Sequence, residues 1–146
     1  MYTQTEYILF ICTGNFYRSR FAEYYFNFLT TQMGGTQKAF SRGLEVFMAR
    51  NRKKGALSQE VLAYLKQLEI PLETNQRYPR QLLMADLQKA SKVIALDETE
   101  HRKMFQRYYP QYVSGVEFWK VHDVDRTTPE EALPAIKLLI DRMFGQ

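Results

Sequence analysis

The chain has 146 residues, of which 45% are hydrophobic and 14% aromatic, and its formal net charge is +4. This length fits one domain over residues 1–146, and the apolar content is sufficient for a single core. The single cysteine excludes an internal disulfide framework and a cysteine-rich zinc site. No basic segment leads into a long apolar run and none approaches membrane-spanning length, so a cytoplasmic protein without a membrane partner is expected.

The positive charge suits acidic or phosphorylated partners, and taken alone it would equally permit nucleic acid. The basic residues around Arg50, in residues 50–54, form one patch without a recognisable nucleic-acid-binding motif. Basic runs are usually solvated loops, although on the rim of a cleft this one would favour acidic peptides. We therefore do not expect nucleic acid as a partner.

Residues 8–11 form a short apolar run with no polar face, which is typical of a strand covered on both sides in a parallel sheet. The chain then turns at residues 13–15. From residue 19 onward apolar side chains recur at helical spacing. The pattern predicts a strand, a tight loop and a helix.

A loop of this kind points backbone N–H groups inward at the positive end of a helix and so forms an anion-binding nest. Cys12 lies at its entrance and Arg18 at its exit, and both the nest and Arg18 favour a thiolate. Arg18 can also grip two phosphate oxygens, and Ser19, as the expected helix N-cap, can bond either the first helical turn or the sulfur. The predicted phosphate-binding residues are Thr13, Gly14, Asn15, Phe16, Tyr17, Arg18 and Ser19.

A short Cys-x5-Arg match is also compatible with a buried, unreactive cysteine at the end of a strand. The position of the match between a strand and a helix favours the functional interpretation. So do Gly14 and Asn15, because both tolerate the unusual backbone angles that a tight loop needs.

Residues 12–19 read Cys-Thr-Gly-Asn-Phe-Tyr-Arg-Ser. They resemble the signature of the low-molecular-weight protein tyrosine phosphatases, Cys-x-Gly-Asn-x-Cys-Arg-Ser. The resemblance implies that Cys12 forms a phosphocysteine intermediate and that Arg18 binds phosphate. It also implies that Ser19 assists the thiolate and that Asn15 braces the loop. Tyr17 stands where many members carry a second, protective cysteine, so that redox switch is absent.

The rest of the chain alternates strands with helices. Strands are expected at residues 39–44 and 92–97 and from residue 116, and helices after Ser58, near residues 82–87, at 98–108 and from residue 128. This order predicts a single doubly wound α/β domain with a central, mostly parallel four-stranded sheet flanked by helices. In such a fold the site lies at the carboxyl ends of the strands.

Two further residues follow from the family resemblance. Residues 41–43 resemble the family's Ser-Ala-Gly turn, with Arg42 replacing alanine, and this implies that Ser41 bonds Asn15 and supports the loop. Phe47 falls where members usually carry an aromatic wall of the substrate cleft, although a plain core role is nearly as well supported.

A phosphatase of this kind needs a carboxyl group to protonate the leaving oxygen and later to activate water. Family members carry an Asp-Pro in the relevant loop. Aligning Trp119 and Val121 with the family's Trp-x-Val-x-Asp-Pro pattern puts the aspartate at Asp123, with Val124 in place of proline. Asp123 is the predicted general acid and Asp125 the reserve, while a polar loop before a helix remains the alternative for both.

The favoured function is therefore a metal-free, cofactor-free phosphatase that uses Cys12, Arg18 and Asp123. Its substrate would be a phosphotyrosine-containing protein or a small aryl phosphate, and phosphate or vanadate-type oxyanions would inhibit it. The altered loop after Asp123 supports one alternative, a catalytically weakened module that binds phosphotyrosine or phosphate without turnover. No His, Asp or Glu cluster has metal-ligand spacing, and His101 and His122 are expected to be packing or surface residues.

Overall fold

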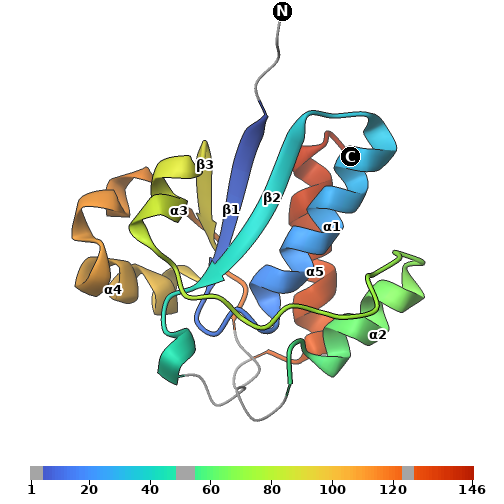
Figure 1. The fold of residues 1–146 in the computed structure, drawn as a ribbon, viewed down its shortest axis with the longest axis horizontal. Coiled ribbons are helices and arrows are strands. Elements are labelled where there is room, and N and C mark those ends of the chain that lie inside the picture. Colours follow the sequence, from blue (N-terminus) through green and yellow to red (C-terminus); the bar gives the residue numbers. More distant parts are fainter. Residues whose placement is uncertain (1–4, 49–54, 123–126) are drawn as a thin grey trace, which may run out of the picture.

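The computed structural model describes residues 5–48, 55–122 and 127–146. Four strands form one sheet in the order β2-β1-β3-β4 (Figure 1). Each neighbouring pair of these strands is parallel. The strands are β1 (Glu6–Cys12), β2 (Gln37–Gly43), β3 (Lys92–Ala95) and β4 (Val116–Phe118).

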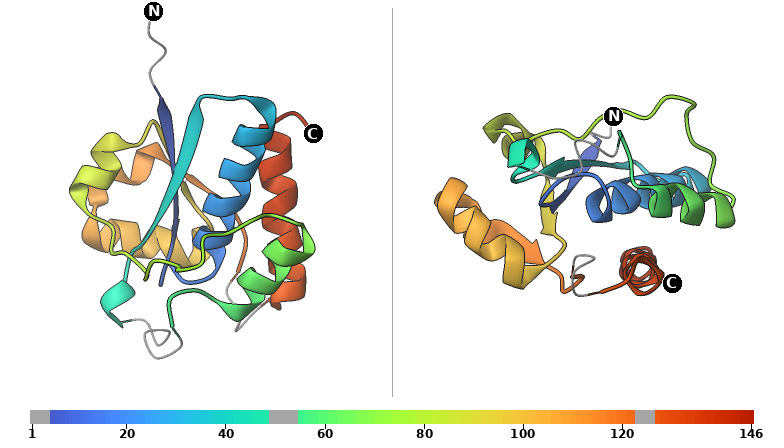
Figure 2. Two further views of the ribbon diagram at one scale, coloured as in Figure 1. Left: turned by 45° about the vertical axis from the view of Figure 1, so that its right-hand side comes forward. Right: turned by 90° about the horizontal axis from the view of Figure 1, so that it is seen from below.

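Helices cover both faces of the sheet, as the views in Figure 2 show. Apolar residues of α1, α2 and α5 pack on one face, and residues of α3 and α4 pack on the other. The helices are α1 (Arg18–Met33), α2 (Gln59–Gln67), α3 (Met84–Lys89), α4 (Glu98–Tyr108) and α5 (Pro129–Met143), with short 3-10 turns η1 (Val46–Met48) and η3 (Pro110–Gly115). The predicted α/β class, parallel sheet and flanking helices are confirmed.

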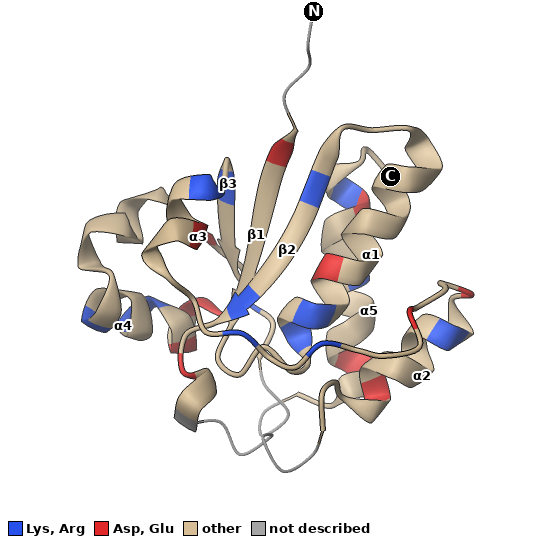
Figure 3. Cartoon of the chain, viewed as in Figure 1, with Lys and Arg blue, Asp and Glu red and all other residues tan. Residues whose placement is uncertain are grey.

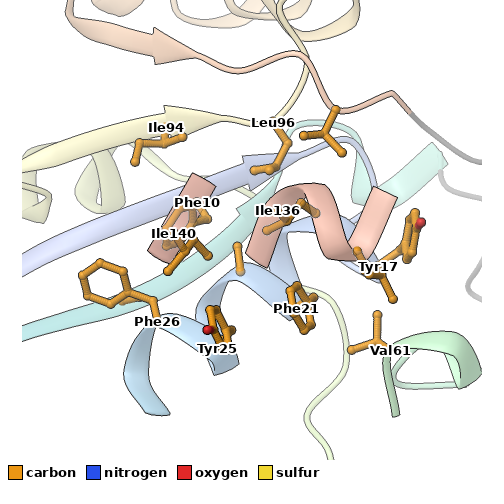
Figure 4. Packing of buried hydrophobic residues seen from close by; sticks show 14 of the residues in the cluster. Phe10, Tyr17, Phe21, Tyr25, Phe26, Val61, Ile94, Leu96, Ile136 and Ile140 are labelled. Atoms are coloured by element: carbon orange, nitrogen blue, oxygen red, sulfur yellow. The ribbon is translucent and has the colours of Figure 1, made fainter. Parts of the chain in front are cut away.

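The central strand β1 explains why the fold has two cores. Its side chains alternate between the faces, so Ile8 and Phe10 join the cluster under α1 and α5, whereas Leu9 and Ile11 join the cluster under α3 and α4. Figure 4 shows the first cluster, in which Phe10 lies among side chains of α1 and α5. Full burial of such a side chain stabilises the fold by roughly 1.5–3 kcal/mol, so β1 is anchored from both sides.

Element boundaries agree closely with the sequence prediction, with two instructive differences. Ser58 caps α2 as expected, since its side chain accepts a bond from the Val61 N–H. Ser19 was expected to be the N-cap of the first helix, but the helix begins at Arg18 and its N-cap is Tyr17. The third strand was expected to reach residue 97, yet it ends at Ala95, because Asp97 caps α4 through the Thr99 N–H.

No helix in the described parts of the chain is both long enough and apolar enough to span a bilayer.

Gly43 joins the end of β2 to the loop that follows β1. A Cβ atom at this position would lie 2.5 Å from Val46 Cγ2, 2.7 Å from the Thr13 carbonyl oxygen and 3.0 Å from the Asn15 nitrogen. Two of these three neighbours are backbone atoms, which cannot rotate away. Glycine is required here because the two chain segments approach too closely for a side chain.

We predict that Gly43→Ala destabilises the protein by about 1–3 kcal/mol, the usual effect of overpacking, and also impairs anion binding by the adjacent loop. Gly115→Ala is the matched control, because a Cβ at Gly115 meets nothing within 4 Å. Denaturant unfolding of both variants tests this. Equal stabilities for the two variants would contradict the close approach at Gly43.

Candidate active site

Residues 12–19, here called the phosphate loop, connect the carboxyl end of β1 to α1. The strand pairing continues into the loop, since the Leu44 N–H donates to the Cys12 carbonyl oxygen at 3.0 Å and the Glu45 N–H to that of Thr13 at 2.9 Å. On the far side, the Ser58 N–H donates to the Phe16 carbonyl oxygen at 3.1 Å. The loop is therefore held by backbone bonds from both flanking segments.

Cys12 is a free, buried cysteine with its Sγ atom 2.9 Å from Ser19 Oγ. The Ser19 oxygen also accepts a bond from Asn15 Nδ2 at 2.8 Å. Either atom can donate in the contact between sulfur and hydroxyl; when Cys12 is a thiolate its sulfur carries no proton, so the Ser19 hydroxyl is then the donor. A hydroxyl donor in this position stabilises a thiolate. Ser19 thus bonds the sulfur, one of the two roles that the sequence left open.

Asn15 adopts a left-handed backbone conformation with φ of 52° and is completely buried. Its Nδ2 donates to Ser19 Oγ and to Ser41 Oγ at 2.9 Å, while its Oδ1 accepts from Arg77 Nη1 and from the Arg80 backbone N–H, both at 3.0 Å. All donors and lone pairs of the amide are used. The geometry predicted for Asn15 and Ser41 is therefore present.

Two arginines tie this network to the surrounding chain. Arg77 Nη2 donates to Ser41 Oγ and forms an ion pair with Glu23 Oε1, both at 3.0 Å. Arg20 is fully buried and donates to carbonyl oxygens, that of Asn15 at 3.3 Å and those of Ala56 and Arg77 at 2.9 Å. Burial lowers the pKa of Arg20, but the group remains a cation at any physiological pH.

Arg18 is 1% exposed and lies at the end of the loop, where its Nη1 donates to the Val121 carbonyl oxygen at 2.8 Å. Two carboxylates flank the guanidinium: Glu100 Oε2 lies 3.1 Å from Nη2, and Asp97 Oδ2 lies 3.9 Å from Nη1. The side chain is thereby held at the phosphate loop by contacts from the segments that follow β3 and β4. Figure 3 shows the acidic positions at the start of α4 and the basic positions on α1, β2 and the segment that crosses below the strands.

Glu100 and His101 form a polar edge of the site with Thr13. Thr13 Oγ1 donates to Glu100 Oε2 and lies 3.2 Å from His101 Nε2. Burial tends to raise the pKa of Glu100, but the His101 bond, the Arg18 charge and the Thr13 bond outweigh it and hold that pKa well below its usual range. Burial lowers the pKa of His101, so the ring is neutral near pH 7.

Of the remaining predicted site residues, the structure describes Phe47 but not the two candidate acids. Phe47 is 51% exposed on η1, just beyond the carboxyl end of β2, and is therefore not a core residue. Asp123 and Asp125 lie outside the described residues, and so does the whole basic run at 50–54. Among the residues that the structure describes, no group of His, Cys, Asp and Glu could hold a metal ion.

The sequence profile of the low molecular weight phosphotyrosine protein phosphatases matches residues 7–132. The chain belongs to this family. Family members are hydrolases that act on phosphoric monoesters, and Cys12 occupies the phosphate-loop position of the fold. A comparison with curated protein sequences finds no match.

Several solved structures share the fold of this phosphatase. The low molecular weight protein tyrosine phosphatase from T. tengcongensis has 24% identity and a TM-score of 0.79, with 96% of this chain and 98% of that chain covered. For YfkJ from Bacillus subtilis the identity is 22%, the TM-score 0.81 and the coverage 98% and 94%. The YwlE arginine phosphatase from Geobacillus stearothermophilus has 23% identity and a TM-score of 0.71, with 94% and 90% covered.

Sequence reasoning did not find three residues of this phosphatase site: Arg77, Glu100 and His101. Arg77 lies in an irregular connection without a periodic pattern, so nothing in the sequence singled it out. Glu100 and His101 lie near the start of α4, the helix that follows the buried strand β3, and the rule that sites gather at the carboxyl ends of parallel strands was a usable signal for them. His101 was expected to be a packing or surface residue, and it is buried against the loop.

We predict that Arg77→Ala lowers the free energy of unfolding by roughly 1–3 kcal/mol, since it leaves the buried Asn15 oxygen short of one donor. The turnover of an aryl phosphate should fall with it. Arg80→Ala is the control, because the exposed Arg80 contributes its backbone N–H to Asn15 and the variant keeps that group. Thermal unfolding and kcat for both variants test this, and wild-type values for Arg77→Ala would contradict the bracing role.

Proposed function

We propose that this phosphatase hydrolyses phosphotyrosine, in proteins or as small aryl phosphate monoesters, through a phosphocysteine intermediate on Cys12. The observation that carries the proposal is the 2.9 Å contact between Cys12 Sγ and Ser19 Oγ inside a loop that ends at Arg18. This arrangement combines a nucleophile, a donor that stabilises its anionic form and a cation for the phosphoryl oxygens.

In the proposed first step, the Cys12 thiolate attacks phosphorus and the bond from phosphorus to the leaving oxygen breaks. Asp123, as the acid, donates its proton to that oxygen, and the alcohol or phenol departs. In the second step the Asp123 carboxylate takes a proton from water while the water oxygen attacks phosphorus. The phosphorus–sulfur bond breaks, which releases phosphate and restores the thiolate. Arg18 and the loop N–H groups stabilise the equatorial oxygens in both steps.

The assignment of Asp123 is supported by its neighbour in the chain. The Val121 carbonyl oxygen accepts a bond from Arg18 Nη1 at 2.8 Å, so the segment that leads to Asp123 starts at the phosphate loop. Asp123 lies two residues after Val121, whereas Asp125 lies four residues after it. Asp123 is therefore the first choice for the acid and Asp125 the reserve.

Exposed Phe47 supports the choice of an aryl substrate. An aromatic side chain at the carboxyl end of β2 is free to stack on a phenyl phosphate that enters the phosphate loop. Two of the similar structures are described as arginine phosphatases, which makes phosphoarginine the most informative substrate to compare with phosphotyrosine.

The first test is hydrolysis of para-nitrophenyl phosphate with chelator present, comparing wild type with Cys12→Ser. We expect chelator-resistant turnover in wild type, its loss in the variant, and competitive inhibition by phosphate or vanadate. Hydrolysis rates are then compared for a phosphotyrosine peptide and a phosphoarginine peptide that differ only at the phosphorylated residue, and this comparison assigns the substrate. Hydrolysis of phosphoarginine alone would refute the phosphotyrosine proposal, and anion binding without any turnover would favour the weakened binding module.

A second test separates the two candidate acids. Asp123→Asn should reduce kcat for a substrate with a poor leaving group by roughly 10²–10⁴-fold, the usual contribution of a general acid. Asp125→Asn should leave kcat close to wild type. The opposite pattern would move the assignment to Asp125.

A further inference from the structure

Glu100 contacts the Arg18 guanidinium, which binds the phosphoryl oxygens in the proposed mechanism. Its Oε2 atom accepts a bond from Arg18 Nη2 at 3.1 Å, and the same oxygen accepts from Thr13 Oγ1. Thr13 and Arg18 lie at opposite ends of the phosphate loop. A single carboxylate oxygen therefore bridges two groups that would otherwise face an anion.

His101 fixes the direction of the hydrogen bonds at this point. Its Nδ1 accepts a bond from the Asp97 backbone N–H at 3.0 Å, which leaves the proton on Nε2. Nε2 lies 3.2 Å from both Glu100 Oε2 and Thr13 Oγ1, so it donates toward the pair. The Thr13 hydroxyl can then accept from His101 and turn its own proton outward, to Glu100 or to another anion.

The two carboxylates beside Arg18 differ in their freedom to move. The Asp97 side chain is 2% exposed, caps α4 through the Thr99 N–H and bonds His122 Nδ1 at 2.9 Å. The Glu100 side chain is 25% exposed and bonds only through one oxygen in the described part of the chain. Glu100 is thus the carboxylate that can rotate toward solvent without breaking a helix cap.

We propose that Glu100 is an internal competitor of the phosphoryl group for Arg18 and Thr13, and so sets the affinity of the site for anions. The inference rests on the proposed function, since it needs the phosphate loop to bind a phosphoryl group. The carboxylate keeps Arg18 in position, and an arriving phosphoryl dianion must replace it. After replacement, the Thr13 hydroxyl, still bonded to His101, offers its proton to the anion.

The competition follows from elementary electrostatics. A carboxylate in contact with Arg18 neutralises most of the field that attracts a dianion, and two anions cannot share one guanidinium edge without repulsion. The burial of Arg18 strengthens both effects because the surroundings screen charge poorly. The same repulsion also weakens the binding of the product phosphate.

The experiment compares Glu100→Gln with Glu98→Gln by isothermal titration calorimetry with inorganic phosphate. Both variants remove one negative charge from the first turn of α4, but the Glu98 carboxylate pairs with Arg102 at 2.8 Å and, within the described residues, forms no ion pair with the phosphate loop. We expect Glu100→Gln to bind phosphate roughly tenfold more tightly than wild type, about the effect of one hydrogen bond to a charged group. Glu98→Gln should bind like wild type.

Unchanged or weaker phosphate binding by Glu100→Gln would overturn the inference, provided that thermal unfolding shows the variant to be folded. Equal tightening in both variants would overturn it as well, because the effect would then come from the general field of the helix. Should Glu100→Gln be unfolded, Glu100→Ala is measured in the same way and judged by the same outcomes. If no protein binds phosphate, the proposed function fails together with the inference, whereas binding by wild type with no gain in the variant refutes the inference alone.

Discussion

The phosphate loop depends on the side chain of Asn15. A left-handed residue in a tight loop is unfavourable unless local bonds hold it, and the Asn15 amide makes four such bonds, to Ser19, Ser41, Arg77 and the Arg80 backbone. Its amide nitrogen donates to the two hydroxyls, and its oxygen accepts from the Arg77 guanidinium and the Arg80 backbone N–H. The Ser19 oxygen that accepts from this amide lies 2.9 Å from the Cys12 sulfur. One amide therefore braces the loop and also holds the hydroxyl that contacts the nucleophile.

The sheet supplies the frame for this amide. β1 is buried on both faces, so the position of Cys12 at its end is fixed by two independent cores. β2 lies beside it in parallel register, which brings Ser41 and the side-chain-free Gly43 against the loop. The irregular segment that carries Arg77 closes the network from outside the sheet. Elements far apart in sequence thus meet at one edge because parallel strands all end there.

Charge around Arg18 is balanced rather than simply positive. The guanidinium contacts a carbonyl oxygen and Glu100 and lies close to Asp97, so its position is fixed by groups that also offset its charge. A net charge of +4 for the chain says little about such a site. Affinity for a phosphoryl group depends on which of these contacts can be exchanged for it, and the partly exposed Glu100 is the one with room to move.

Much of the fold was predictable because its signals are local. A short stretch of sequence is enough to predict the apolar run of β1, the cap at Ser58 and the helix over 98–108. The structure confirms all three. The place of the phosphate loop was also predictable, since its motif is contained in eight positions and the structure has the expected strand, loop and helix there. Arg77 and Glu100 were not, because their roles arise from contacts with residues 62 and 82 positions away along the chain. The N-cap assignment of Ser19 failed because its hydroxyl is used by the sulfur and by Asn15.

The central claim is that Cys12 becomes covalently phosphorylated during turnover. The most direct measurement is rapid acid quenching during hydrolysis of an aryl phosphate, followed by mass spectrometry of the peptide that contains Cys12. The account predicts a phosphoryl group on the Cys12 sulfur that appears within one turnover and decays as the substrate is exhausted. Turnover with no phosphorylated enzyme, or with the phosphoryl group on another side chain, would contradict it.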